Sequence, residues 1–382
     1  MPDLKNKTIL ILSPQAWGKM FVSKHHYAIE LAKRGNKVYF LNPPDQVKVD
    51  RAEPVEIKAS NAHPNLYLIE HKLFFPYRLK FRALPVFHWL MRFHIKKLLK
   101  KIGHPVNIVW SFDLGNLYPF HLFGDRPYKI FHPVDEPLNP PAIQAAKGAN
   151  IIFSVTNEIL AKYNQFDIPN HFINHGVTED FLAETITEEI NDPIRVGFSG
   201  NLLRIDTDRE TLLQIVQENK QCIFEFWGSY TTAQANIGGH EDASAKKFIE
   251  SLRHHKHVIL HGAVAAQELA KSIKRMDVFL ICYDVKRDQS KGTNYHKVME
   301  YMATGKVIVS NNITTYRDEP DLVRMISERI SNDSLPLLFS KVLGDLTNQN
   351  SVSIQAKRIA FAKMNAYKEQ LLKIESMITS QR

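Results

Sequence analysis

Short apolar runs rich in β-branched and aromatic residues alternate with stretches of helical spacing along most of the chain. In the first half, seven such runs predict strands: Thr8–Ser13, Lys37–Leu41, Leu66–Ile69, Asn107–Ser111, Tyr128–His132, Ile151–Val155 and His171–Asn174. Apolar spacing predicts a helix over Val22–Arg34, which Gly35 would end. This alternation of strands and helices favours an α/β architecture built on a mainly parallel sheet.

A polar, acidic segment that ends in proline, Thr185–Pro193, interrupts the alternation and is typical of a linker. A second series of predicted strands follows it: Ile194–Ser199, Cys222–Trp227, His257–His261, Val278–Cys282 and Val307–Ser310. The tail Ser353–Ser376 has the spacing of one long helix. We therefore predict two doubly wound Rossmann-like domains, residues 1–185 and 186–350, that face a central cleft. We expect residues 351–382 to form a C-terminal helix that packs back toward the first domain.

The charge of the chain is concentrated in one segment. The 382 residues include 49 Lys and Arg and 40 Asp and Glu, a net charge of +9. Nine of the basic residues and none of the acidic ones lie in His71–His104, so the rest of the chain is neutral. A basic balance suggests a phosphate-bearing partner such as a nucleotide, an anionic lipid or a nucleic acid. The location of the charge points to one surface of the first domain.

Cysteine usage and hydropathy indicate the compartment. The two cysteines, Cys222 and Cys282, both lie within apolar runs, which favours buried, reduced thiols in the cytoplasm over a disulfide scaffold. Residues Met1–Lys7 lead directly into a predicted strand and contain no signal-peptide core. No apolar run approaches the roughly 18 residues that a membrane-spanning helix needs.

The stretch Asp277–Ser310 carries the most informative chemistry. A predicted strand leads into a polar loop with Gly292, and a short helix is predicted to start near Asn294 and to end at Gly305. Lys297 and Glu300 are three residues apart, so they share one helix face. A lysine neutralises phosphate and a carboxylate accepts hydrogen bonds from ribose hydroxyls. The spacing alone fits either a diphosphate–ribose site or an ordinary surface Lys–Glu pair.

The sequence HKVMEYMATGKVIVS, residues His296–Ser310, resembles the donor-binding signature of nucleotide-sugar glycosyltransferases of the GT-B fold. It is similar to group 1 and family 4 members that build bacterial polysaccharides. Arg195–Asn201 resembles the opening of that family's C-terminal domain, and Ala149–Leu160 and Asn170–Phe181 resemble the end of its N-terminal domain. Two positions depart from the pattern: Gly292 occupies the place of a second glutamate, and Asn201 stands near the place of an arginine.

The resemblance implies a transferase, hexosyltransferase-like, that takes a sugar from a nucleoside-diphosphate donor. The residues implied in donor binding are Glu300, Lys297, Asn294, Thr293, Arg204 and Gly200. Glu300 would bind the ribose, and Lys297 and Arg204 would contact the diphosphate. The donor sugar is the only small molecule expected, with no other cofactor and no metal. The acceptor would be a glycan or a lipid-linked sugar in cell-surface polysaccharide biosynthesis.

Candidate catalytic groups follow the strand Tyr128–His132. Asp135 and His132 would lie at its carboxyl end, where ligands bind in this class of fold. A carboxylate or an imidazole there can take the proton of an acceptor hydroxyl, and Asp135 is the first choice. The alternative is that Asp135 caps the helix that follows the next prolines.

The basic segment also contains a predicted amphipathic helix, Phe87–Ile102, whose apolar face faces the core. Its opposite face combines aromatic and cationic residues: Trp89, Arg92, Phe93, Lys96, Lys97 and Lys100. Such a face suits an anionic membrane surface, which would make the protein peripheral on the inner side of the membrane. A solvated charged face and nucleic-acid binding remain alternatives, although no nucleic-acid motif is present. A nucleotide-sugar epimerase, which needs no acceptor, is the other rival function.

Overall fold

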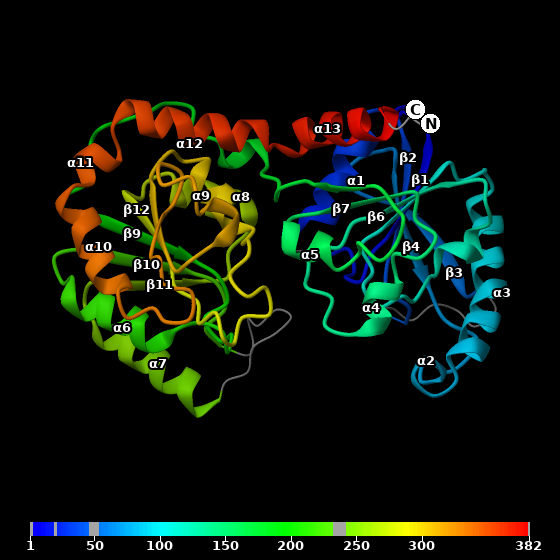
Figure 1. Ribbon diagram of the computed structural model, residues 1–382, viewed down its shortest axis with the longest axis horizontal. Coiled ribbons are helices and arrows are strands. Elements are labelled where there is room, and N and C mark those ends of the chain that lie inside the picture. The colour runs from blue at the N-terminus through cyan, green and yellow to red at the C-terminus, as the bar shows by residue number, and fades with distance from the viewer. Residues whose placement is uncertain (1–2, 19–20, 46–52, 232–241, 381–382) are drawn as a thin grey trace. The chain divides into compact units, whose positions relative to one another are not determined.

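The computed structural model describes residues 3–18, 21–45, 53–231 and 242–380. The chain divides into two compact units. Unit 1 comprises residues 1–174 and 367–382, and unit 2 comprises residues 175–366. Figure 1 shows that each unit consists of a twisted sheet covered by helices. Among the described residues, no helix is long and apolar enough to cross a membrane.

The sheet of unit 1 has eight strands in the order β3-β4-β2-β1-β5-β6-β7-β8. Their bounds are β1 Thr8–Leu12, β2 Lys37–Leu41, β3 Val55–Ala59, β4 Leu66–His71, β5 Ile108–Ser111, β6 Tyr128–Phe131, β7 Ile151–Ser154 and β8 Asn170–Phe172. Every neighbouring pair is parallel except the edge pair of β3 and β4. All seven predicted strands are present, and β3 is the one that the sequence analysis missed.

Helices cover both faces of this sheet. They are α1 Ser23–Lys33, α2 Leu79–Arg82, α3 Leu84–Ile102, α4 Pro140–Gln144, α5 Asn157–Ala161 and α13 Tyr367–Thr379. Alternate residues of β1 face opposite sides, as strand geometry requires. Leu10 packs in the cluster that includes residues of α3, whereas Ile9 packs with residues of α1 and α13. The sheet is therefore doubly wound, as predicted.

Unit 2 has a six-stranded parallel sheet in the order β11-β10-β9-β12-β13-β14. Its strands are β9 Arg195–Ser199, β10 Ile223–Trp227, β11 Val258–Gly262, β12 Val278–Ile281, β13 Val307–Ser310 and β14 Arg324–Met325. Its helices are α6 Arg209–Glu218, α7 Ala243–His254, α8 Ala266–Ile273, α9 Lys297–Met302, α10 Leu335–Gly344, α11 Leu346–Gln349 and α12 Val352–Met364. Two core clusters lie on its two faces, one with α6, α7 and α10, the other with α8 and α9.

The boundary between the units lies earlier than the sequence predicts, at residues 174–175 rather than 185–186. The segment between these positions packs into unit 2, because Val177 and Phe181 are buried in one core cluster with Met299. The amide of Ala183 also donates to the carbonyl of Ala303 at 2.8 Å. Apolar anchoring of this segment, rather than the polar run that follows it, sets the boundary.

The C-terminal tail forms two helices in place of the single predicted one. The helix α12 ends at Met364, and the side chain of Asn365 donates to the carbonyl of Phe361 at 2.9 Å. Side chains such as asparagine compete with the backbone for hydrogen bonds, which favours a helix end. The break places α12 in unit 2 and α13 in unit 1. Only α13 therefore follows the prediction that the tail returns to the first domain.

Candidate functional site

The strand order of unit 2 reverses direction between β9 and β12, which makes this the switch point of the sheet. Ligands of doubly wound sheets bind beyond the carboxyl ends of the strands at such a point. The carboxyl end of β9 is held in place by Tyr301 of α9, whose hydroxyl accepts the Ser199 amide at 2.6 Å. The Tyr301 ring stacks on Phe279 of β12 at 4.1 Å between centroids. These contacts fix α9 against the switch point.

Lys297, the first residue of α9, reaches the switch point. Its ammonium group donates to the Ser199 carbonyl at the end of β9 and to the Tyr283 hydroxyl just after β12. It also lies over the rings of Phe198 and Tyr283, 4.9 and 4.8 Å from their centroids. The structure thus brings a lysine that the sequence singled out to the two strand ends where a ligand is expected.

The surroundings of Lys297 lower the pKa of its ammonium group in the protein without a ligand. Burial and, to a smaller extent, the nearby Arg204 lower the pKa of Lys297 to about 7, against the attraction of Glu300 and Asp206. A buried cation that is barely retained at neutral pH is stabilised by any anion that binds beside it. The arrangement is suited to a phosphate group.

Arg204 lies near Lys297 but is already paired. Its Nε donates to Asp206 at 2.8 and 3.1 Å, and its Nη2 donates to the same carboxylate. This pairing raises the pKa of Arg204, so the guanidinium stays charged. Asp206 is buried, whereas the Arg204 side chain is 42% exposed. The partner Asp206, which the sequence analysis did not consider for this role, holds the arginine in place.

Glu300 lies one turn along α9 from Lys297 and is largely buried, with 14% of its side chain exposed. Burial raises its pKa, while His296 and Lys297 act in the opposite direction. The Nδ1 atom of His296 is 3.4 Å from the Glu300 carboxylate. A carboxylate in this position can accept hydrogen bonds from two neighbouring hydroxyl groups of a ligand.

The loop before α9 is organised by Asp288, a buried residue that the sequence analysis missed. Its carboxylate accepts the amides of Ser290 at 3.0 Å and Gly292 at 2.9 Å, and the Tyr295 hydroxyl at 2.7 Å. The α-helix begins at Lys297 rather than near Asn294, because the preceding residues belong to this loop. The role of Asp288 could have been inferred from the sequence of this polar loop, in which Ser, Gly and Tyr follow the aspartate in the pattern Asp–x–Ser–x–Gly–x–x–Tyr.

Thr293 and Asn294, both predicted donor-binding residues, are buried at the end of this loop. The Thr293 hydroxyl donates to the Ser290 carbonyl at 2.8 Å, and its own carbonyl accepts the Thr315 hydroxyl at 2.6 Å. Thr293 therefore supports the loop. Because α9 has only six residues and starts beyond them, the expected helix N-terminus does not lie at these two residues.

Gly200 occupies a position that only glycine fits well. Its φ of +149° is unfavourable for other residues, and a Cβ there would lie 2.5 Å from the Lys297 Nζ. A Cβ on Gly228, at the end of β10, would overlap the Gly200 carbonyl. The two glycines let the ends of β9 and β10 approach each other beside Lys297.

In unit 1 the switch point lies between β1 and β5, and charged residues gather near it. Asp113, after β5, is buried and accepts the amides of Gly115 and Leu117 at 2.7 Å each. Asp135, after β6, is exposed. It does not cap the next helix, because the side chain of Asn139 caps α4. The helix-capping alternative for Asp135 is therefore wrong.

Lys24, at the start of α1, was not singled out from the sequence. It is 3% exposed, and burial lowers its pKa to about 8 despite the attraction of Asp135 and Asp113. It gives unit 1 a second buried lysine near a switch point. The position after β1, at the start of the first helix, was the available signal.

His132, the second candidate base, lies inside the core. Its ring packs on Phe112 at 5.0 Å and on Trp110 at 6.0 Å between centroids. Burial lowers its pKa to about 3, so it is neutral at physiological pH and a weak proton acceptor. Its Nδ1 atom has no partner among the described residues. Asp135 is the stronger of the two candidates on chemical grounds.

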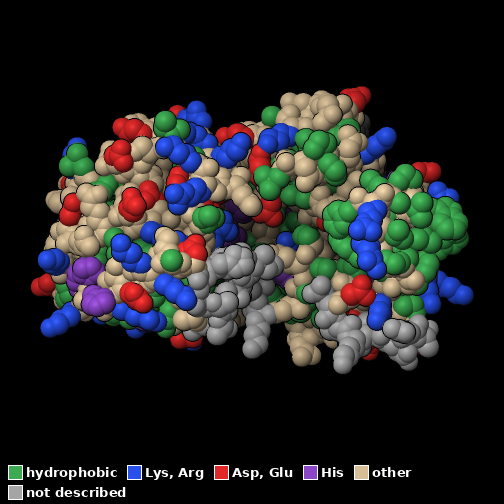
Figure 2. Space-filling model, turned by 90° about the horizontal axis from the view of Figure 1, so that it is seen from below, with side chains coloured by type: hydrophobic (Ala, Val, Ile, Leu, Met, Phe, Trp, Pro, Cys, Tyr) green, Lys and Arg blue, Asp and Glu red, His purple; other side chains and the backbone are tan. Residues whose placement is uncertain are grey.

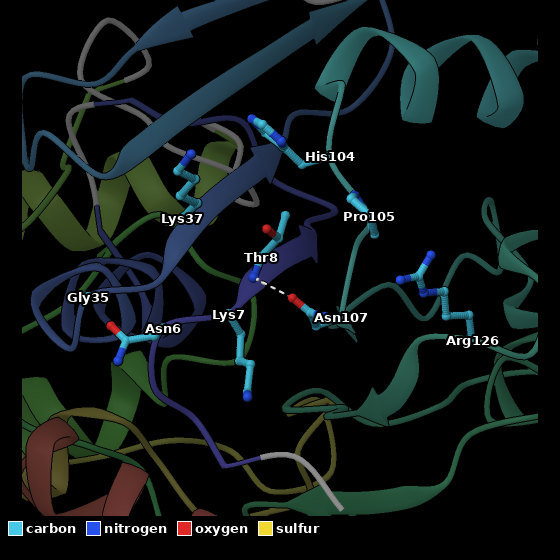
Figure 3. Close-up of a pocket in the computed structure, with 9 residues that line it drawn as sticks. All are labelled: Asn6, Lys7, Thr8, Gly35, Lys37, His104, Pro105, Asn107 and Arg126. Carbon is cyan, nitrogen blue, oxygen red and sulfur yellow. Dashed lines mark hydrogen bonds between the residues drawn. The ribbon is translucent and has the colours of Figure 1, made fainter.

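A basic hollow of about 370 Å³ lies at the opposite edge of the unit 1 sheet (Figure 3). Lys7, Lys37 and Arg126 reach it from three separate segments, and the Thr8 amide donates to Asn107 at its base, at 2.9 Å. Since these residues precede the strands β1, β2 and β6, the hollow lies at the amino ends of the strands. It is separate from the candidate residues described above.

The predicted docking residues lie together on the outer face of α3, and all six are exposed. On the opposite face Phe87, Met91, Ile95, Leu98 and Ile102 are buried, as predicted. Among the described residues, no group of three or more His, Cys, Asp or Glu is arranged to hold a metal ion. Cys222 and Cys282 are buried free thiols, and burial raises the pKa of both.

No protein-family model and no curated protein matches this sequence. Solved structures, however, match almost the whole chain. The sucrose-phosphate synthase of Thermosynechococcus elongatus matches with a TM-score of 0.70 and 11% identity, covering 98% of this chain and 99% of the other. Anabaena HepE, solved with UDP and glucose, matches with a TM-score of 0.65 and 12% identity over 98% and 100%.

A third similar structure is WaaG, a glycosyltransferase involved in lipopolysaccharide biosynthesis, with a TM-score of 0.62, 12% identity and coverage of 97% and 99%. These proteins have the GT-B fold, and two parallel doubly wound sheets agree with it. The chain therefore has the GT-B fold that the sequence predicted. At this level of identity, the likeness establishes the fold alone.

Proposed function

We propose that this GT-B protein is a glycosyltransferase that moves a sugar from a nucleoside-diphosphate donor to a glycan or lipid-linked acceptor. Anabaena HepE was solved with UDP and glucose and also with UDP-glucose, and a similar structure from E. coli was solved with UDP-2-fluoro glucose, which supports a nucleotide-sugar donor. The structurally similar WaaG is involved in lipopolysaccharide biosynthesis, which supports a role in making cell-surface polysaccharide. The buried, unpaired cysteines are in keeping with a cytoplasmic enzyme.

One observation carries the proposal: Lys297 and Glu300 lie on one turn of α9 at the switch point of unit 2. The Lys297 ammonium, held by Ser199 and Tyr283, would bind the donor diphosphate. Glu300, 14% exposed, would accept hydrogen bonds from the ribose hydroxyls. The spacing of one helical turn suits neighbouring diphosphate and ribose groups. Gly200 leaves room for the donor to approach the backbone.

Departure of the nucleoside diphosphate leaves negative charge on its phosphate oxygens. Preorganised cations at that position lower the barrier without reorganising during the reaction. We assign this role to Lys297 and to Arg204, which Asp206 holds in place. These two cations would offset part of the charge of the departing diphosphate, and we propose that the reaction proceeds without a metal.

For the acceptor we assign the proton-accepting role to Asp135 of unit 1. Its carboxylate is exposed and is not engaged as a helix cap, so it can meet an acceptor hydroxyl. His132 is a weaker proton acceptor because burial lowers its pKa to about 3. An Asp135→Asn variant should retain donor binding and lose transfer.

A thermal-shift screen of nucleoside diphosphates tests the donor site directly. A ligand at 100 times its Kd adds about 2.7 kcal/mol to the free energy of unfolding, which raises the melting temperature measurably. We expect UDP or another nucleoside diphosphate to give this shift, and the Lys297→Met variant to lose it. The matched control is Lys271→Met, which removes an exposed lysine of α8 in the same unit. Equal shifts in both variants would refute the donor site.

Product analysis separates the proposal from its rivals. Incubation with the nucleotide sugar that binds, but with no acceptor, should leave the sugar unchanged. Appearance of an epimerised sugar would favour the epimerase function instead. Absence of a shift with every nucleotide, together with tight binding to an oligonucleotide, would favour a nucleic-acid-binding protein.

A further inference from the structure

Large hydrophobic side chains are exposed together on one surface of unit 1. They are Phe74, Tyr77, Phe81, Leu84, Val86, Trp89 and Phe93, with 39–76% of each residue exposed. They come from the segment before α2, from α2 itself and from the first half of α3. Figure 2 shows hydrophobic and cationic side chains gathered side by side at one end of the molecule. Single exposed apolar residues are ordinary, whereas a contiguous group marks a surface that meets something apolar.

Buried residues hold these exposed rings in place. Phe74 contacts Phe75 edge to face at 4.9 Å, and Phe75 contacts the fully buried Phe87 at 5.3 Å. Trp89 and Phe93, one turn apart on α3, contact each other at 5.1 Å. Because the base of the group belongs to the core, the aromatic surface is formed by the folded protein without a partner.

The same outer face of α3 carries the positive charge. At about 100° per residue, Trp89, Phe93, Arg92 and three lysines fall within an arc of roughly 140°. The three lysines are Lys96, Lys97 and Lys100. The buried residues of α3 lie on the opposite side. One helix face therefore combines aromatic rings over its first turns with cations over its remaining turns.

Few acidic groups offset this charge. The segment His71–His104 has nine basic and no acidic residues. Lys101 is paired with the exposed Glu53 at 3.1 Å, and among the described residues this is the one ion pair that a lysine or arginine of the segment makes. Lys80 lies 5.7 Å above the Tyr77 ring and 5.8 Å above the Phe81 ring.

We propose that this surface, residues 74–100, docks the protein onto an anionic membrane with α3 lying flat on the lipid. Aromatic side chains and long cationic side chains are the groups that occupy the boundary between headgroups and acyl chains. Leu84 and Val86 favour lipid over nucleic acid, because exposed aliphatic groups gain more from acyl chains than from a charged phosphate backbone. The proposal does not depend on the sugar-transfer reaction.

The structure adds residues outside α3 to the part of the surface that would enter the lipid. The predicted docking residues lie in the middle of α3, but the most exposed aromatic residue is Phe81 of α2, at 76%. Together with Trp89 it would insert at one end of the surface, while the lysines up to Lys100 would contact headgroups. At 1.5 Å per residue, Lys100 lies about 16 Å along the helix from Trp89. The surface is long enough to touch several lipid headgroups.

Sedimentation of the full-length protein with lipid vesicles tests the proposal. We expect the protein to pellet with vesicles of phosphatidylcholine and phosphatidylglycerol, and much less with phosphatidylcholine alone. Added salt should weaken binding, because it screens the attraction between lysines and headgroups. Equal pelleting with both kinds of vesicle, or with neither, would overturn the proposal. Preference for an oligonucleotide that displaces the protein from vesicles would also overturn it.

Two variants separate the cationic and aromatic contributions. Reversing three charges, Lys96→Glu, Lys97→Glu and Lys100→Glu, should lower partitioning onto anionic vesicles by about 100-fold or more, since each cation contributes roughly tenfold or somewhat less. Replacing Phe81 and Trp89 by serine should weaken binding and leave its salt dependence intact. Both variants change exposed side chains, so we expect the melting temperature to stay close to that of the unchanged protein.

The matched control reverses three exposed lysines of unit 2: Lys246→Glu, Lys247→Glu and Lys271→Glu. It makes the same change in net charge and should leave vesicle binding within a few-fold of the original. If it lowers binding as much as the reversal on α3, net charge rather than this surface directs binding and the proposal fails.

Tryptophan fluorescence gives a local readout of the same event. Of the four tryptophans, Trp89 is 58% exposed, Trp17 is half-buried, and Trp110 and Trp227 are buried. Insertion should shift the emission to shorter wavelength, and the shift should disappear in a Trp89→Phe variant that still pellets. A shift that persists in this variant would place the lipid contact elsewhere.

Discussion

Binding of a nucleoside diphosphate should take up a proton, because burial lowers the pKa of Lys297 to about 7 in the free protein. Above that pH the free lysine is mostly neutral, while a diphosphate beside it favours the ammonium form. The apparent Kd for UDP should therefore rise with pH. Between the pKa of Lys297 in the free protein and its pKa in the complex, the apparent Kd should rise by up to tenfold per pH unit. From pH 7 to pH 9 the loss of affinity reaches up to about 50-fold, because half of the lysine is already neutral at pH 7.

Calorimetric titration with UDP at several pH values measures both effects. At pH 8, repetition in buffers with different ionisation enthalpies should reveal uptake of close to one proton. The Lys297→Met variant should bind UDP more weakly, with a Kd that no longer depends on pH over this range. The Lys271→Met control should keep the slope of the unchanged protein. A Kd that is flat from pH 7 to pH 9, or a slope that survives Lys297→Met, would refute the reasoning.

The same lysine predicts how stability depends on pH. A lysine whose pKa is lowered on folding binds fewer protons in the folded than in the unfolded state between about pH 7 and its usual pKa near 10.5. Its contribution to the free energy of unfolding therefore rises with pH in this window, by about 1.4 kcal/mol per unit. Urea unfolding without ligand should show this rise relative to Lys297→Met. A parallel pH profile in the two proteins would contradict the low pKa.

Three further predictions follow from the site and the core. Glu300→Gln should weaken UDP binding roughly 10- to 100-fold, because hydrogen bonds to a charged group contribute about 1.5–3 kcal/mol. Calorimetry measures this change, and the control Glu268→Gln, at an exposed residue, should not alter UDP binding. Asp288→Ala should lower the free energy of unfolding by about 3 kcal/mol in urea, because it leaves buried donors unsatisfied; a loss under 1 kcal/mol would contradict the role of this carboxylate. Burial lowers the pKa of His71 to about 3 and of His94 to about 4, so both are neutral when folded and protonated when unfolded between about pH 4 and 6. Stability should fall on acidification below pH 6.5 by up to ~1.4 kcal/mol per unit for each, and a His94→Phe variant should show a shallower fall.

Much of the fold follows from local pattern. Hydrophobic periodicity gives nearly all strands of the two mainly parallel sheets, and β2 and β13 have the predicted bounds. It also gives the buried face of α3. These features depend on residues close in sequence, since strand and helix periods arise from the geometry of the backbone itself. The edge strand β3 was missed although its sequence, Val55–Ala59, alternates between apolar and polar residues.

Unit boundaries depend on which apolar residues pack together over long distances. The segment after β8 joins unit 2 because Val177 and Phe181 enter its core, although a more polar run follows. The single long helix expected at the tail is divided by Asn365. A pattern of spacing does not show where such a helix changes its packing partner.

The candidate donor site, too, was predicted from the sequence only in part. Sequence alone placed Lys297 and Glu300 on one helix face, because a spacing of three residues fixes that relation. Only the tertiary structure brought Lys297 to the ends of β9 and β12, paired Arg204 with Asp206, and centred the preceding loop on Asp288. The order of the strands determines which loops meet at one edge of a sheet. Burial determines which lysine has a lowered pKa. Both arise from contacts between residues far apart in the chain, which local periodicity does not encode.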